Sequence, residues 1–241
     1  MLKVKKIAII TISSILGLAA GYGLTAYYAQ VIETQIRANV TAEVKALETQ
    51  ISDFQAHQAA AAAKVREYEK AEAAVVSAIR FSNAKVSESQ KASMVAILSR
   101  IAMNEFSNFE QRELWLVLLG IESRFNVKAK SPSGALGIGQ VMPGSAKWYG
   151  EQCGLPAISE EDLFDLTINA TISACIFNQL LKRTNGSPSM MLLAYNAGEF
   201  TKDLARLEKM ESINKESASY IAKISRFLEK MRGTNLLKGN K

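Results

Sequence analysis

Glu122 is the residue whose type and setting most clearly suggest chemistry. It ends an apolar run whose hydrophobic residues recur at helical spacing, and Ser107 or Asn108 can cap that helix at its start. We therefore expect a helix that ends near Glu122. The helix dipole and the apolar neighbours both disfavour an ionised carboxylate there, so the pKa of Glu122 should be raised. Such a carboxyl group can donate a proton, although an exposed helix-end residue paired with Arg124 is the alternative.

A glycine-rich segment follows this carboxylate. Residues 131–143 read SPSGALGIGQVMP and place three glycines where backbone can approach a ligand closely. Gln140, at the end of the glycine run, offers a hydrogen-bond donor and an acceptor. Residues 130–154 hold six glycines and no long run of alternating β-branched residues. We expect a loop there and not a sheet.

Four motifs, in this order, resemble the catalytic domain of lytic transglycosylases of the soluble type, a family related to goose-type lysozyme. The motifs are Glu122-Ser123 with Phe125-Asn126; Gly134-Ala135 through Gly137 to Gln140, with Met142-Pro143; Ala194-Tyr195-Asn196-Ala197-Gly198; and Glu216-Ser217 followed by Tyr220. Together they cover roughly residues 90–230. The resemblance implies a lysozyme-like α fold with a groove for alternating N-acetylglucosamine and N-acetylmuramic acid, and with Glu122 beneath the scissile bond.

The same resemblance implies a role for each matched residue. Glu122 would act twice, first as an acid on the glycosidic oxygen and then as a base on the C6 hydroxyl of muramic acid, which closes a 1,6-anhydro ring without consuming water. Ser123 would orient Glu122 or the muramic acid, and a tyrosine hydroxyl could hydrogen-bond Glu122. The residues that would line the groove are Gln140, Met142, Tyr195, Asn196 and Tyr220.

Other interpretations of these residues stay open. Met142 and Tyr195 could belong to the core, Asn196 to a turn, and Tyr220 to the packing of the last helix. Glycosidases commonly use two carboxylates, but the acidic cluster at 160–165 lies near a helix start, where we interpret it as capping. The alternative functions are a hydrolytic muramidase and a non-catalytic glycan-binding scaffold of an envelope-spanning or phage machine.

The N-terminus predicts a membrane segment. Three lysines lie within residues 1–6, and the uncharged residues 7–29 are long enough to cross a hydrocarbon core of roughly 30 Å. The positive-inside rule then keeps residues 1–6 in the cytoplasm and places the catalytic domain in the periplasm, on a single-pass anchor in the bacterial inner membrane. The alternatives are a signal peptide cleaved after Ala19, which would release a secreted protein, and a protein of a phage virion.

Residues 30–85 predict a helical spacer that precedes the catalytic domain. Apolar residues alternate at steps of three and four, a heptad pattern that favours a coiled coil and a homo-oligomer, with a lone solvated helix as the alternative. We expect a mostly α catalytic domain over residues 86–232 and a flexible tail over 233–241. The heptad positions are Val40, Val44, Leu47, Ile51, Phe54, Ala61, Val65, Tyr68, Val75 and Ile79.

Composition excludes several other classes of function. The net charge of +6 is modest for 241 residues and is not gathered into basic runs, so we expect peptidoglycan glycan strands and the inner membrane as partners and no nucleic acid. His57 is the only histidine, which argues against a metal site or a catalytic triad, and we expect no cofactor. Cys153 and Cys175 lack zinc-site spacing and form either a disulfide or two buried thiols.

Overall fold

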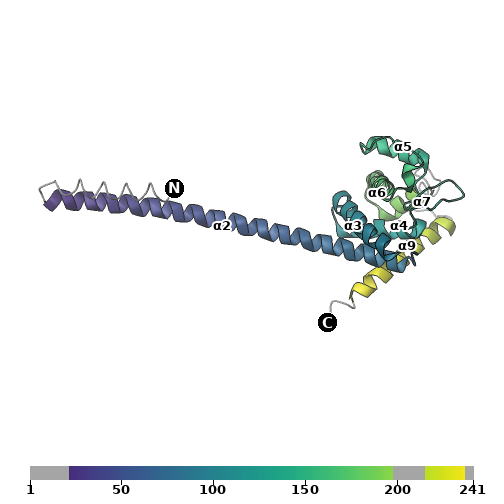
Figure 1. Cartoon of the computed structure of the whole chain (residues 1–241), viewed down its shortest axis with the longest axis horizontal. Helices are drawn as coiled ribbons and strands as arrows, with labels where there is room; N and C mark the ends of the chain where they lie inside the picture. The colour runs from purple at the N-terminus through teal and green to yellow at the C-terminus, as the bar shows by residue number, and fades with distance from the viewer. Residues whose placement is uncertain (1–21, 198–214, 237–241) are drawn as a thin grey trace. The chain divides into compact units, whose positions relative to one another are not determined.

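The computed structural model describes residues 22–197 and 215–236 (Figure 1). Within these ranges the chain is helical, with two isolated β-bridges and no strand, so the predicted mostly α fold is confirmed for them. The chain divides into two compact units, residues 1–63 and residues 64–241.

In the first unit the structure describes the greater part of one long helix, α2 (Tyr22–Phe81). No glycine or proline interrupts the chain between Gly23 and Gly120, so nothing in the helix interior breaks its hydrogen-bond ladder. Its 60 residues extend roughly 90 Å at 1.5 Å per residue. The heptad side chains are solvent-exposed in this unit, from 47% at Val44 to 64% at Phe54. The structure therefore has the predicted helix and leaves its apolar stripe uncovered.

The predicted membrane segment at residues 7–29 lies mostly outside the described residues. Among the helices that the structure does describe, none is both long enough and apolar enough to cross a membrane. The membrane anchor therefore remains a prediction.

The last turns of α2 belong to the second unit. Ala71, Val75 and Ile79 are buried in its hydrophobic core, and Glu67 forms an ion pair of 3.0 Å with the buried guanidinium of Arg112. The domain boundary that we predicted near residue 86 thus falls inside a unit that begins at residue 64. The heptad pattern, interrupted at Glu72, continues into this region, so the sequence did not distinguish an exposed apolar stripe from one packed on a core.

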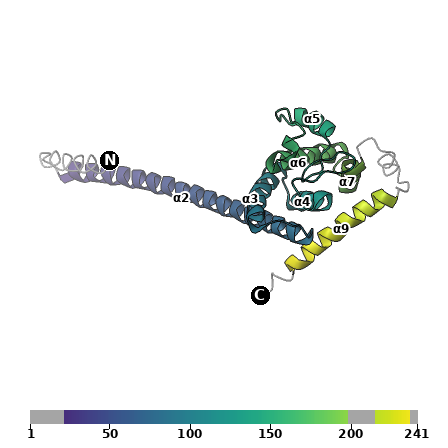
Figure 2. The same ribbon diagram turned by 45° about the vertical axis from the view of Figure 1, so that its right-hand side comes forward.

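The remaining helices of this unit surround α4 and α6. The N-terminal half consists of α3 (Glu88–Glu105), which begins with a capping box between Ser87 and Gln90, and α4 (Phe109–Ser123), which Asn108 caps. In the C-terminal half the structure describes α6 (Leu166–Arg183), α7 (Pro188–Ala197) and α9 (Lys215–Leu236). Helix α6 contacts α3, α5 and α7, and α9 packs against α4 and α7 (Figure 2). Helix α9 extends past residue 232, where we expected the tail to begin.

The segment expected to be a loop contains a helix, and that prediction is wrong for residues 143–152. Helix α5 (Pro143–Gln152) begins with a proline at its first turn, where the missing N–H and the fixed φ suit a helix start. We gave too much weight to the glycines at positions 144 and 150. The single-turn helix η2 (Asp162–Phe164) follows, and a Cys153–Cys175 disulfide links the end of α5 to α6.

Candidate active site

Helix α4 positions Glu122 at its C-terminal end, as predicted. Residues 112–120 of this helix are all buried, and Ser123 is its last residue. The helix stops because Arg124 and Phe125 both adopt left-handed backbone conformations, with φ of 54° and 60°. Phe125 is fully buried, which holds this turn in place. The half-buried Glu122 side chain is therefore set on rigid backbone on both sides.

Helix α9 approaches α4 closely at Gly120, two residues before Glu122. A Cβ atom built on Gly120 would lie 3.0 Å from the ring of Phe227 on α9 and 3.3 Å from Phe125. Only glycine leaves room for that approach without a shift of the neighbouring rings. The contact brings the N-terminal part of α9, and with it Tyr220, to the catalytic end of α4.

Tyr220 donates a hydrogen bond of 2.5 Å from its hydroxyl to Oε1 of Glu122. Burial raises the pKa of Glu122 to about 7, although the Tyr220 hydroxyl opposes the shift because it favours the ionised form. Burial and then the charge of Glu122 raise the pKa of Tyr220 well above its ordinary value, so its hydroxyl stays protonated and remains a donor. Glu122 is thus a carboxyl group that exchanges its proton near neutral pH, as the sequence led us to expect.

Two further site residues hold the glycine-rich loop against the end of α4. The Ser123 hydroxyl donates to the carbonyl oxygen of Ile138 over 2.7 Å, and the Tyr195 hydroxyl donates to that of Gly139 over 2.8 Å. Of the two tyrosines that could have bonded Glu122, Tyr220 therefore does so, and Tyr195 fixes the loop instead. Burial first, and then the charge of Glu122, raise the pKa of Tyr195.

Asn169 is a structural residue of the site that the sequence analysis missed. From α6 its amide nitrogen donates to the carbonyl oxygens of Leu136 (2.9 Å) and Leu163 (2.7 Å), and its amide oxygen accepts the N–H of Gly139 over 2.8 Å. Its exposed fraction is only 1%. An asparagine at a core-facing position of an apolar helix was the available signal, because a buried amide must find partners.

Gly137 cannot carry a side chain in this arrangement. Its φ is +72°, and a Cβ atom there would lie 2.1 Å from the carbonyl oxygen of Leu163 and 2.2 Å from the amide nitrogen of Asn169. Gln140, also in a left-handed conformation with φ of 50°, folds its side chain back and donates to the Gly137 carbonyl over 2.9 Å. The loop is therefore rigid, and its shape depends on hydrogen bonds to α6.

The remaining predicted groove residues are on the surface. Met142 is 42% exposed and precedes the first turn of α5, and Asn196 is exposed near the end of α7. Their roles toward sugars remain predictions. Among the residues that the structure describes, no three histidine, cysteine, aspartate or glutamate side chains are grouped so as to hold a metal ion.

The candidate site thus has a half-buried carboxyl group at the end of a buried helix, within a mostly α unit. Residues 99–217 match the family described as Transglycosylase SLT domain. Residues 99–217 therefore form a transglycosylase SLT domain, which confirms the resemblance seen in the motifs.

Two solved structures are similar to the chain. One is an inactive mutant of lytic transglycosylase Slt from Pseudomonas aeruginosa, with 27% identity and a TM-score of 0.49. The other is the 70 kDa soluble lytic transglycosylase Slt70 from Escherichia coli, with 20% identity and a TM-score of 0.50, which supports the fold. Each match covers 58% of this chain and 24% of the other, so the chain aligns with about a quarter of each. A comparison with curated proteins gives no match.

The hydroxyl of Tyr220 should set the proton affinity of Glu122. In Tyr220→Phe the carboxylate loses its donor while its burial remains, so we expect the pKa of Glu122 to rise above about 7. A carbon-13 NMR titration of the glutamate carboxyl carbons, assigned by comparison with Glu122→Gln, measures the change. Tyr68→Phe removes a hydroxyl from α2 and should leave the titration as it is. An unchanged or lower pKa in Tyr220→Phe would contradict the assigned role.

Proposed function

We propose that this chain is a peptidoglycan lytic transglycosylase. It cleaves the β-1,4 bond between N-acetylmuramic acid and N-acetylglucosamine and leaves a 1,6-anhydro-muramic acid end. The observation that carries the proposal is the carboxyl group of Glu122, which has a pKa raised by burial to about 7 and a hydrogen bond from Tyr220, in a domain of the transglycosylase SLT family. An acid with a pKa close to working pH can both give and take a proton.

Glu122 performs both proton transfers in this mechanism. As the neutral acid it protonates the glycosidic oxygen, which departs with the N-acetylglucosamine side of the strand, while the substrate's own N-acetyl group stabilises C1 of muramic acid. As the resulting carboxylate it removes the proton of the C6 hydroxyl, whose oxygen then bonds to C1. The enzyme is returned to its neutral form and no water is consumed.

The described residues around the site support a one-carboxylate mechanism. Asp165 caps α6 by accepting the backbone N–H groups of Thr167 and Ile168, and Asp162 accepts hydrogen bonds from Ser159. Glu113 is paired with Arg232 at 3.0 Å. Asp162 and Asp165 of the cluster at 160–165 thus have the structural partners that we expected, and none of these contacts involves Glu122.

The released products test the reaction directly. Purified residues 30–241 are incubated with peptidoglycan, and the soluble muropeptides are analysed by mass. We expect anhydro products, lighter by one water than hydrolytic ones, and a loss of roughly 10²- to 10⁴-fold in rate for Glu122→Gln, the range that a general acid–base group contributes. Glu110→Gln, which makes the same change at an exposed position of α4, should stay active.

Other outcomes select the alternatives. If the products have a reducing end and Glu122→Gln no longer forms them, the protein is a hydrolytic muramidase. Binding to peptidoglycan with no release of product by the unmodified protein would favour a glycan-binding scaffold.

We also propose that residues 7–29 anchor the chain in the bacterial inner membrane, with the catalytic unit in the periplasm, where peptidoglycan is found. The uncharged segment behind three lysines supports this topology. The full chain should then fractionate with membranes and be released by detergent but not by high salt, whereas a chain that starts at residue 30 should be soluble. Extraction of the full chain by salt alone, or loss of its first residues in cells, would refute the anchor.

The exposed heptad stripe of α2 supports a second proposal, that chains associate through this helix. Leu47, Ile51 and Phe54 are 56–64% exposed, and burying such a stripe against a second copy is favourable. Sedimentation velocity of residues 30–241 should show concentration-dependent association that is lost in Leu47→Gln/Ile51→Gln. The matched change Ala42→Gln/Ala46→Gln, on the opposite side of the helix, should retain it. A monomer at all concentrations would refute the proposal.

A further inference from the structure

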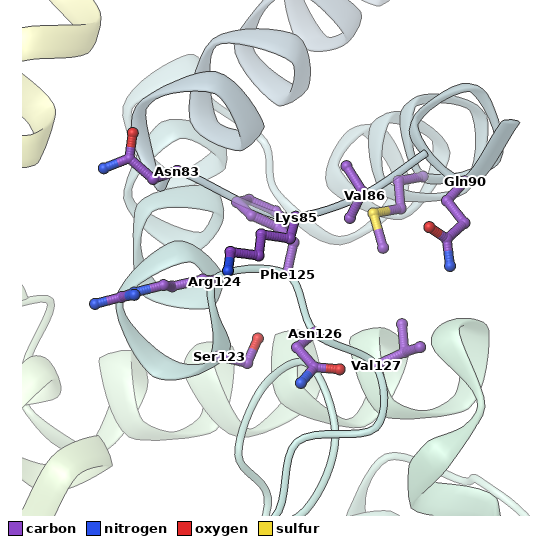
Figure 3. A pocket seen from close by; sticks show the side chains of 10 residues that line it. Asn83, Lys85, Val86, Gln90, Ser123, Arg124, Phe125, Asn126 and Val127 are labelled. Carbon is purple, nitrogen blue, oxygen red and sulfur yellow. The ribbon is translucent and has the colours of Figure 1, made fainter. Parts of the chain in front are cut away.

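A pocket of about 420 Å³ opens beside the catalytic end of α4 (Figure 3). Ser123, the residue after Glu122, forms part of its wall, but the predicted groove residues Gln140, Met142, Tyr195, Asn196 and Tyr220 do not. Its polar lining comes from the connection between α2 and α3 (Asn83, Lys85), the first turn of α3 (Gln90), and the turn after α4 (Arg124, Asn126).

The lining of this pocket is positively charged. Lys85 and Arg124 both contribute to it, and no aspartate or glutamate does. In the part of the chain that the structure describes, neither cation is within ion-pair distance of a carboxylate. Figure 3 shows both side chains extending toward the same side of the pocket. A carboxylate placed there would therefore find two cations that no carboxylate of the described residues pairs with.

The backbone that carries these two cations is held in place. Arg124 has a left-handed conformation and donates its N–H to the Gly120 carbonyl over 3.1 Å, and the buried ring of Phe125 follows it. Lys85 lies between Asn83, which is also left-handed, and the capping box that starts at Ser87. Both charges are thus presented from fixed backbone positions, which reduces the entropy lost when an anion binds.

The rest of the lining is apolar and suits a small aliphatic group. Val86, Met94, Phe125 and Val127 complete the pocket, and Met94 and Phe125 are buried in the core behind it. The side-chain amides of Gln90 and Asn126 also line the pocket, and their oxygens accept the backbone N–H groups of Ser87 and Lys128. A ligand that fits combines a carboxylate, amide groups and a methyl-sized side chain, which is the chemistry of a short peptide with alanine and an acidic residue.

We propose that this pocket binds a carboxylate of the stem peptide that the muramic acid next to the scissile bond carries, so that the enzyme favours peptide-bearing strands over bare glycan. This inference rests on the proposed function. The pocket adjoins Ser123, whose neighbour in the chain is the proposed acid, and so it lies where a muramic acid substituent can reach. Asn83, Lys85, Val86, Gln90 and Met94 all precede residue 99, where the family match begins, so much of the pocket belongs to this chain's own N-terminal region.

A binding experiment tests the pocket without requiring catalysis. The detergent-solubilised full chain with Glu122→Gln is titrated by calorimetry with N-acetylmuramoyl-L-alanyl-D-glutamate and with its diamide, which lacks the carboxylates. We expect the acid to bind roughly 10-fold more tightly than the diamide, a preference worth about 1.4 kcal/mol. Lys85→Gln/Arg124→Gln should abolish the preference. Arg100→Gln/Lys182→Gln, which removes two exposed positive charges elsewhere in the unit, should keep it.

A rate comparison completes the test. The double variant Lys85→Gln/Arg124→Gln, with Glu122 intact, should cleave peptide-bearing peptidoglycan roughly 10-fold more slowly than the Arg100→Gln/Lys182→Gln control, and both should cleave amidase-stripped glycan at equal rates. Equal affinities for acid and diamide, or an equal loss of rate on both polymers, would overturn the pocket's role while leaving the proposed function intact. A carboxylate preference in a native protein that cleaves neither polymer would refute the proposed function and not the pocket.

Discussion

The burial of one carboxyl group at the end of a buried helix is the constraint on which this structure depends. Desolvation raises the pKa of Glu122 to about 7, and a single hydrogen bond from Tyr220 is the opposing interaction. Because this folded-state pKa lies above the ordinary value of 4.5, folding favours the protonated form. The stability associated with the neutral site is full below about pH 4.5 and is lost as the pH rises through about 7. The free energy of folding is therefore more favourable with Glu122 in its neutral, proton-donating form than with Glu122 ionised.

Two ion pairs on consecutive residues of α4 hold its neighbours in register. Arg112 reaches Glu67 of α2, and Glu113 accepts from Arg232 near the end of α9. Arg232 and Tyr220 lie on the same helix, and their partners on α4 lie in the opposite order, so the two helices are antiparallel and are tied at both ends. A buried charge that loses its partner is strongly destabilising, which makes this register hard to change. The position of the Tyr220 hydroxyl therefore depends on contacts far from the carboxyl group.

The sequence predicted those features that depend on local chemistry. A cap at Ser107 or Asn108, the end of α4 near Glu122 and the raised pKa of Glu122 follow from helix-terminus rules and apolar surroundings. The structure has all three, with Asn108 as the cap. It could not predict features that depend on tertiary contacts. Whether Tyr195 or Tyr220 bonds Glu122 is decided by the approach of α9 at Gly120. The same heptad pattern in a sequence is also compatible with an exposed helix face and with one packed on a core, and residues 64–81 are an example of the second.

Helix α2 is exposed to solvent in its first part and packs on a hydrophobic core in its last turns, and this difference has an evolutionary consequence. Before residue 63 its side chains face solvent, so a lineage can add or remove helical turns there and change the reach of the protein without disturbing the fold. From Glu67 to Ile79 the same helix supplies core side chains and the partner of Arg112. A one-residue insertion there would rotate every later side chain by about 100° and separate these contacts. Length variation among related proteins should therefore be concentrated upstream of residue 63, while the interval from Glu67 to Arg112 keeps a constant length.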